Sequence, residues 1–152
     1  GLTIAVGQSP AVAIGASAAG SAVGQTADSA YAKVNAINAG GVSGLTATAT
    51  NVTSGTFSTV ATASGASTYN LTVNGIAIYA GSDNLASGAS LTASDVAAQI
   101  NLFSTQTGVS AAVSGTSLTL TASDGRNVAV TETMIVFHIH FGYDVPRNNF
   151  RK

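Results

Sequence analysis

The chain has 152 residues, a net charge of −1 and only 7% charged residues, so it has the size of one ordinary domain or of two very small ones sharing a core. With 5 basic residues there is no basic field to attract nucleic acid or anionic lipid, and we expect neither as a partner. The lack of cysteine excludes disulfides, thiolate metal sites and cysteine nucleophiles. Alanine supplies much of the apolar fraction, which predicts modest burial per residue.

The uncharged stretch before Asp28 does not predict a membrane span or a signal peptide. Pro10 and several glycines interrupt any helix there, and a basic leading region is missing. A chain rich in Thr, Ser, Ala and Gly, without cysteine or a cleavable signal, is typical of extracellular structural proteins exported by a dedicated route.

The first part of the chain predicts a hairpin, a helix and two strands. The expected segments are residues 2–6 and 11–14 as the hairpin, 29–38 as a helix capped by Asp28, and 42–51 and 57–63 as strands around a turn at Ser54-Gly55. Tyr31, Val34 and Ile37 or Asn38 would form the inner face of this helix.

The second part predicts the same order more clearly. Residues 69–79 alternate around Asn74-Gly75, which favours a type I′ hairpin turn because both residues tolerate positive φ. After a loop over residues 80–90, Thr92 or Ser94 caps a helix with Asp95 in its first turn. Its apolar face is expected to hold Val96, Ile100 and Phe103.

Antiparallel strands follow this helix. Residues 109–113 and 117–121 read as strands that turn at 114–116, Asp124-Gly125 makes another turn, and Val128 with Val130 begins a return strand. The predicted fold class is therefore α+β and mostly β, with two related units, each a β-hairpin, one short helix and antiparallel strands.

A short motif marks the duplication. Ile37-Asn38 is followed by Gly41-Val42, and Ile100-Asn101 by Gly108-Val109. Two residues lie between Asn38 and Gly41, but six lie between Asn101 and Gly108, so the second unit carries about one extra helical turn in a connection.

These residues predict a packing role for the motif. The isoleucines would plug each helix against a sheet, and the asparagines would bond backbone at the helix end, where carbonyls lack partners. The glycines suit a chain reversal with positive φ, after which the valines start a strand.

The two copies, residues 29–42 and 94–111, resemble the flagellin IN motif, and Leu118 to Arg126 is similar to what commonly follows it. This resemblance covers roughly residues 2–133. It implies a structural, surface-exposed outer domain of a bacterial flagellar filament protein, extracellular and antigenic, in a motility appendage. The long helical segments by which flagellins polymerise have no counterpart here, so contacts with other flagellin subunits or the filament core would use segments absent from this sequence.

The resemblance divides the chain into residues 1–65, 66–133 and a tail, 134–152. The alternative function is an extracellular adhesin or carbohydrate-binding β-rich module, with Tyr79 and Phe57 as exposed candidate contact residues. Self-association is also expected, because edge strands in a charge-poor chain invite pairing.

The tail departs in composition from the rest. Residues 135–141 alternate as a strand with His138 and His140 on one face, a weak candidate metal pair that needs a third ligand such as Asp144 or Glu132. A half-exposed strand is the preferred interpretation, and a tail foreign to the rest of the chain is the other.

No catalytic or cofactor motif is found, and we expect neither an enzyme nor a cofactor. Serine is too common for a pairing with His138 or His140 to be specific, and a nucleophile elbow is missing. The acidic residues are scattered and fit caps and turns better than an acid/base pair.

Overall fold

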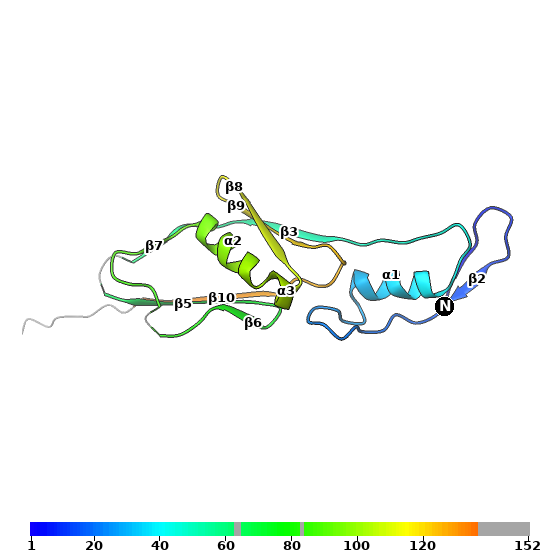
Figure 1. Cartoon of the computed structure of the whole chain (residues 1–152), viewed down its shortest axis with the longest axis horizontal. Coiled ribbons are helices and arrows are strands. Elements are labelled where there is room, and N and C mark those ends of the chain that lie inside the picture. Colours follow the sequence, from blue (N-terminus) through cyan, green and yellow to red (C-terminus); the bar gives the residue numbers. More distant parts are fainter. Residues whose placement is uncertain (63–64, 83, 137–152) are drawn as a thin grey trace, which may run out of the picture.

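The computed structural model of the protein describes residues 1–62, 65–82 and 84–136. The fold is α+β and mostly β, as predicted, and the molecule is elongated (Figure 1). The elements are β1 (Leu2–Ile4), β2 (Val12–Ile14), α1 (Ala30–Ala39), β3 (Asn51–Thr56), β4 (Val60–Ala61), β5 (Ser67–Val73), β6 (Ile76–Tyr79), β7 (Ser90–Leu91), α2 (Ala93–Leu102), α3 (Ser104–Thr107), β8 (Ser110–Ser114), β9 (Ser117–Ala122) and β10 (Val130–Val136).

The molecule has an arm and a body. The arm, residues 1–50, contains the β1–β2 hairpin and α1 at one end of the long axis (Figure 1). The body, which comprises the described residues from 51 to 136, contains the other elements.

All strand pairings in the described part of the chain are antiparallel. The body has two three-stranded sheets, in the orders β3-β9-β8 and β10-β5-β6, and the short pair β4-β7. The pairings of β3 with β9 and of β4 with β7 join residues on opposite sides of the boundary predicted at residue 65. Strands from the predicted first unit therefore complete sheets of the second.

The Asn74-Gly75 hairpin is confirmed. The turn joins β5 to β6, with φ of 51° at Asn74 and 78° at Gly75. Asn74 also holds the returning chain. Its backbone N–H donates to the Ala129 carbonyl (2.8 Å), and its side-chain Oδ1 accepts from the Ala129 N–H (2.9 Å). The turn that ends one hairpin thus positions the start of β10.

Helix α2 begins and packs as its sequence predicts. Thr92 is the N-cap, and Thr92 and Asp95 form a reciprocal capping box in which the Thr92 N–H donates to Asp95 Oδ2 (2.8 Å). These hydrogen bonds lower the pKa of Asp95. Val96 and Ile100 are each 1% exposed, and α2 packs on β8.

The hydrophobic core lies in the body, between α2 and the two larger sheets. Its buried residues are Tyr69, Leu71, Val73, Ile78, Leu85, Leu91, Val96, Ile100, Val109, Leu120 and Ala122. Every member of this cluster lies between residues 69 and 122. The arm contributes none of them.

Two predictions for the first part of the chain are confirmed and three are wrong. The β1–β2 hairpin and the helix form, but Ser29 rather than Asp28 is the N-cap of α1, because the Ser29 side chain accepts from the Ala32 N–H. The strand predicted at 42–51 does not form before Asn51, and Ser54-Gly55 lies within β3 instead of in a turn.

The error over the second pair of strands has a physical cause. Alternating Ala and Thr define no apolar face, so the sequence fixes neither register nor partner. Gly55 offers no side chain to pack, yet it pairs opposite Leu118 because β9 supplies a continuous ladder from Asn51 to Thr56. In the chain before that ladder, residues 45–50 remain extended and pair with no strand.

The two motif isoleucines give a matched stability test. Ile100→Ala should lower the free energy of unfolding by about 3 kcal/mol, because it opens a cavity in the core. Ile37 is only partly buried, so Ile37→Ala should cost about 1 kcal/mol. Urea unfolding of both variants measures the difference, and equal losses would contradict the asymmetry.

Candidate functional site

Each of the two junctions, made of one Ile-Asn pair and one Gly-Val pair, lies between the end of a helix and the segment that follows it. Gly41 has φ of 65° and Gly108 has φ of 69°, so the predicted left-handed conformation is confirmed at both positions. The extra residues of the second copy form the 4-residue helix α3, which Gly108 ends. The insertion is therefore a single helical turn in the connection.

Both motif asparagines hold one residue of the following segment by its backbone. Asn38 Nδ2 donates to the Ala47 carbonyl (3.0 Å), and Asn38 Oδ1 accepts from the Ala47 N–H (2.8 Å). Asn101 does the same to Ala111, at 2.9 Å and 2.7 Å. The prediction that these side chains bond backbone is confirmed, but their partners are not the free carbonyls of the helix end.

The motif valines differ between the two copies. Val109 is fully buried and leads directly into β8, as predicted. Val42 is 8% exposed but starts no strand. Ile37, in the same copy, lines an apolar groove between α1 and the β1–β2 hairpin, with a volume of about 460 Å³. The first copy therefore shares the asparagine bonds and the left-handed glycine with the second, but its Ile37 is only partly buried and its Val42 starts no strand.

A second cluster, which we call the 124–127 turn, lies between arm and body. Its centre is an ion pair in which Arg126 Nη2 donates to Asp124 Oδ2 (2.8 Å), with Arg126 Nε also donating to the same carboxylate. Arg126 Nη1 donates to the carbonyls of Val23 (3.2 Å) and Thr107 (3.4 Å). The guanidinium thus touches both parts of the molecule.

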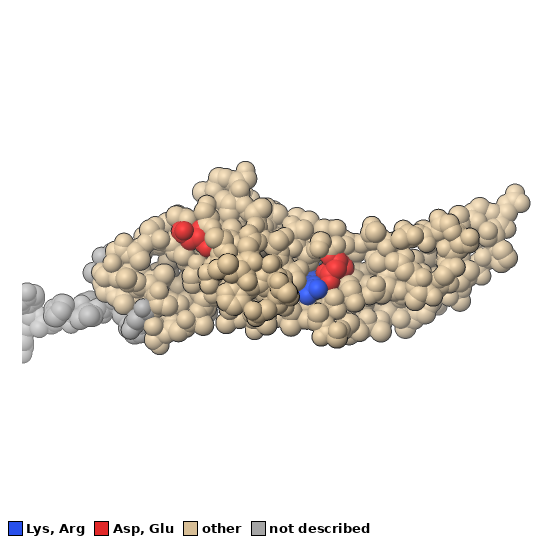
Figure 2. Space-filling model, in the orientation of Figure 1, with Lys and Arg blue, Asp and Glu red and all other residues tan. Residues whose placement is uncertain are grey.

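The Asp124 carboxylate is held in its charged form. Hydrogen bonds from Arg126, and a weaker one from Gln25 Nε2 (3.0 Å), lower its pKa to about 2 despite partial burial. The Arg126 side chain is 13% exposed. Figure 2 shows that the visible face of the molecule carries few charged side chains. A shielded ion pair such as Asp124–Arg126 is therefore unusual for this chain.

Sequence reasoning assigned only a turn to Asp124-Gly125 and gave no role to Arg126 or Gln25. The one available signal was a pair of opposite charges two residues apart in a chain with few charges. The contact with Gln25 spans 99 positions, and no local pattern encodes it.

The described residues contain no group of three or more His, Cys, Asp or Glu side chains that could hold a metal ion. The candidates His138 and His140, and the third ligand Asp144, lie outside the described residues. Glu132 is an exposed residue of β10. Asp95 and Asp124 each accept a hydrogen bond from a near neighbour, as their predicted positions in a first helical turn and in a turn require. Asp28 accepts from Thr26 Oγ1 but does not cap α1.

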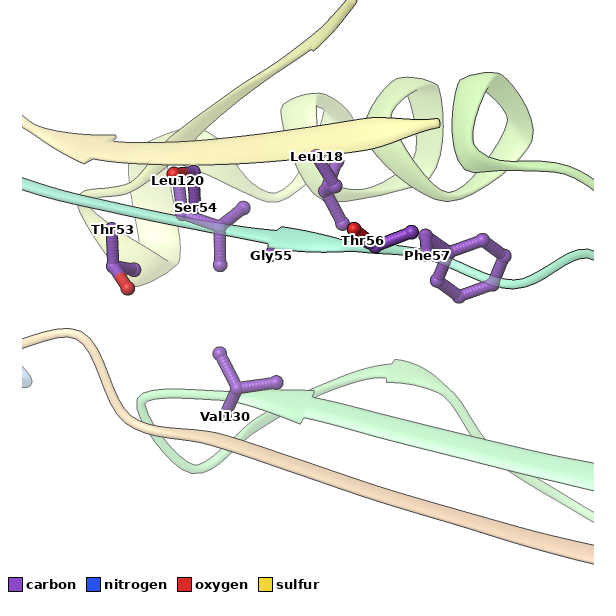
Figure 3. Close-up of a pocket in the computed structure, with 8 residues that line it drawn as sticks. All are labelled: Thr53, Ser54, Gly55, Thr56, Phe57, Leu118, Leu120 and Val130. Atoms are coloured by element: carbon purple, nitrogen blue, oxygen red, sulfur yellow. The ribbon is translucent and has the colours of Figure 1, made fainter. Parts of the chain in front are cut away.

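An apolar groove opens between β3 and β10 (Figure 3). Val130 points across it towards β3, and Phe57 and Leu118 line its wall in a volume of about 240 Å³. Phe57 and Tyr79, which the adhesin alternative expects to be exposed, are both partly buried against the core. The Tyr79 ring packs edge-to-face on Tyr69, and its hydroxyl donates to the Asp95 carbonyl (3.3 Å).

No protein-family model matches this chain, and no curated protein is similar to it in sequence.

None of the helices in the described part of the chain is long and apolar enough to cross a membrane.

Replacing a motif asparagine should loosen the following strand. Asn101→Ala removes both hydrogen bonds to Ala111, so we expect a loss of about 1 kcal/mol in stability and faster amide exchange at Ala111. Leu102→Ala is the matched control, since Leu102 is 76% exposed and should change neither quantity. If exchange at Ala111 were the same in the two variants, the hydrogen bonds from Asn101 to Ala111 would not stabilise the strand.

The two motif glycines should differ in their tolerance of a side chain. Gly41→Ala meets open space, so only the left-handed backbone is strained, at about 1 kcal/mol. A Cβ at Gly108 would lie 2.0 Å from Arg126 Cζ, so Gly108→Ala must also displace the guanidinium. Thermal unfolding should show the larger loss for Gly108→Ala, and a smaller or equal one would argue against this packing.

Proposed function

We propose that the chain is a structural outer domain of a flagellin-like filament protein, exposed on the surface of a bacterial flagellum. The observation that carries the proposal is the duplicated junction. The same side-chain amide holds the same two backbone groups after each helix, at Asn38 and at Asn101, and each junction then turns through a left-handed glycine. These are the residues on which the resemblance to the flagellin IN motif rests.

Other features support a spacing and display role. The molecule is elongated (Figure 1), and several of its described polar side chains form helix caps, turns or hydrogen bonds to a neighbouring backbone that hold the fold together. Many Ser, Thr and Ala residues face outward with few charges, which suits a surface whose role is solubility and antigenic display. Contacts with other flagellin subunits would come from filament-core segments that these 152 residues do not include.

The adhesin alternative has less support. A carbohydrate-binding surface typically presents an aromatic ring whose face is free to stack on a sugar. The two candidate rings, Tyr79 and Phe57, instead pack against the core, and the Tyr79 hydroxyl donates a hydrogen bond to the Asp95 carbonyl.

The location of the protein on the cell tests the proposal. Antibodies raised against the purified chain should label the flagellar filament along its length in immunogold electron microscopy of the source bacterium. A strain lacking the reading frame is the control for specificity. Label on the cell wall, or a wall anchor in place of flanking helical segments in the complete reading frame, would favour the adhesin alternative and reject the filament role.

A further inference from the structure

The arm and the body are joined by hydrogen bonds at one place. Within the described residues, all hydrogen bonds between residues 1–50 and 51–136 end on the 124–127 turn. They are Gln25 Nε2 to Asp124, the Tyr31 N–H to the Gly125 carbonyl, Arg126 Nη1 to the Val23 carbonyl, the Asn127 N–H to the Gly24 carbonyl, and Asn127 Nδ2 to Thr26 Oγ1. Four consecutive residues thus hold a whole end of the molecule.

The turn is fixed to the body independently of the arm. Arg126 donates to the Thr107 carbonyl and lies against Gly108, and its own carbonyl accepts from Asn51 Nδ2 (3.0 Å). Asn74, in the β5–β6 hairpin, holds Ala129 just beyond the turn. The turn therefore presents a preformed surface to the arm.

The fit at this surface is close. The Tyr31 N–H, in the first turn of α1, lies 2.9 Å from the Gly125 carbonyl, and a Cβ on Gly125 would come within 2.5 Å of Ala49 Cβ. A Cβ on Gly24 would lie 2.6 Å from the Asn127 carbonyl oxygen. Neither glycine therefore has room for a side chain, and arm and turn are in close contact here.

The arm has little else to keep it in place. Its buried residues are Ser29, Ala32 and Val42, two of them small, whereas the core cluster belongs to the body. The extended residues 45–50 that connect arm to body pair with no strand. A segment with so few buried apolar contacts has a low free energy of local opening.

We propose that the 124–127 turn is a latch, and that breaking the Asp124–Arg126 pair releases the arm into an undocked, locally unfolded state while the body stays folded. The chain then has two cooperative units, and the order of the arm is conditional on one ion pair. This device does not depend on the proposed filament role.

The latch is sensitive to acid, and the direction of this pH dependence follows from the environment of Asp124. The charged group that contacts this carboxylate is Arg126, on the same turn, and its partner from the arm is the neutral Gln25. Hydrogen bonds from Arg126, on the same turn, are the largest cause of the pKa of about 2, whereas the hydrogen bond from Gln25 is the cause that exists only when the arm is docked. Through this bond the carboxylate stabilises the docked state above the ordinary Asp range. This contribution is lost as the pH falls from about 4 towards 2.

Site-resolved amide exchange tests the latch. In Asp124→Asn the side chain keeps one oxygen but places an NH₂ group against Arg126 or Gln25. We expect exchange at Tyr31 and Ala47 to rise about tenfold or more, with exchange at Val73 nearly unchanged. Asp95→Asn is the matched control, since it removes a carboxylate from the α2 capping box, away from the arm.

An acid titration of the unmodified chain gives a second readout, which stands even if the variant does not fold. The ¹⁵N–¹H resonances of Tyr31 and Ala47 should leave their native positions at a higher pH than that of Val73. In Asp124→Asn, the separate step in the arm should be missing. Equal acceleration of arm and body in the variant, or simultaneous loss of both sets of resonances on acidification, would overturn the proposal and show a single cooperative unit.

Discussion

The contact between the Arg126 guanidinium and the Asp124 carboxylate is the interaction on which the assembly of the two parts depends. The guanidinium is planar and carries several donors, so it can bind a carboxylate and backbone carbonyls at once. Here it reaches Asp124, Val23 and Thr107 together, from a site where its side chain is 13% exposed. Lysine, with one compact ammonium group, could not join three chain segments in this way. In a chain with 7% charged residues, this one pair contributes more to the stability of the structure than exposed surface pairs usually do.

Asparagine side chains supply the ordering that large apolar residues supply elsewhere. A side-chain amide carries the same donor and acceptor as a peptide group, so it can stand in for one residue of a neighbouring strand. Asn38, Asn101 and Asn84 each bond both backbone groups of a single residue, and Asn84 does so at Tyr69 in β5 (2.8 Å and 2.6 Å). The clamps fix extended segments whose Ala and Thr side chains provide little burial.

The part of the fold that was predictable from the sequence is the part with local signals. The Asn74-Gly75 turn, the Thr92–Asp95 cap and the spacing of Val96 and Ile100 encode their own geometry within a few residues. The positive φ of Gly41 and Gly108 was likewise readable. The pairing of β3 with β9 was not, because it depends on a distant strand and on residues without periodicity. The turn at Asp124-Gly125 was predicted, but its contacts with the arm were not, since its partners Val23, Gln25 and Tyr31 are about a hundred positions away.

The two copies of the motif form similar junctions but are stabilised by different contacts. Ile100 and Val109 face a sheet and are buried, so the second copy stabilises itself through apolar packing. In the first copy the strands after the junction, β3 and β4, pair within the body, and α1 is left with only the β1–β2 hairpin to cover. A helix without a sheet of its own must gain its order from polar contacts with a neighbour. The shared strands therefore leave α1 without a larger sheet to cover, while the hydrogen bonds that join the described parts of arm and body end on the 124–127 turn. The second unit in turn relies on β3 and β4 to complete its sheets.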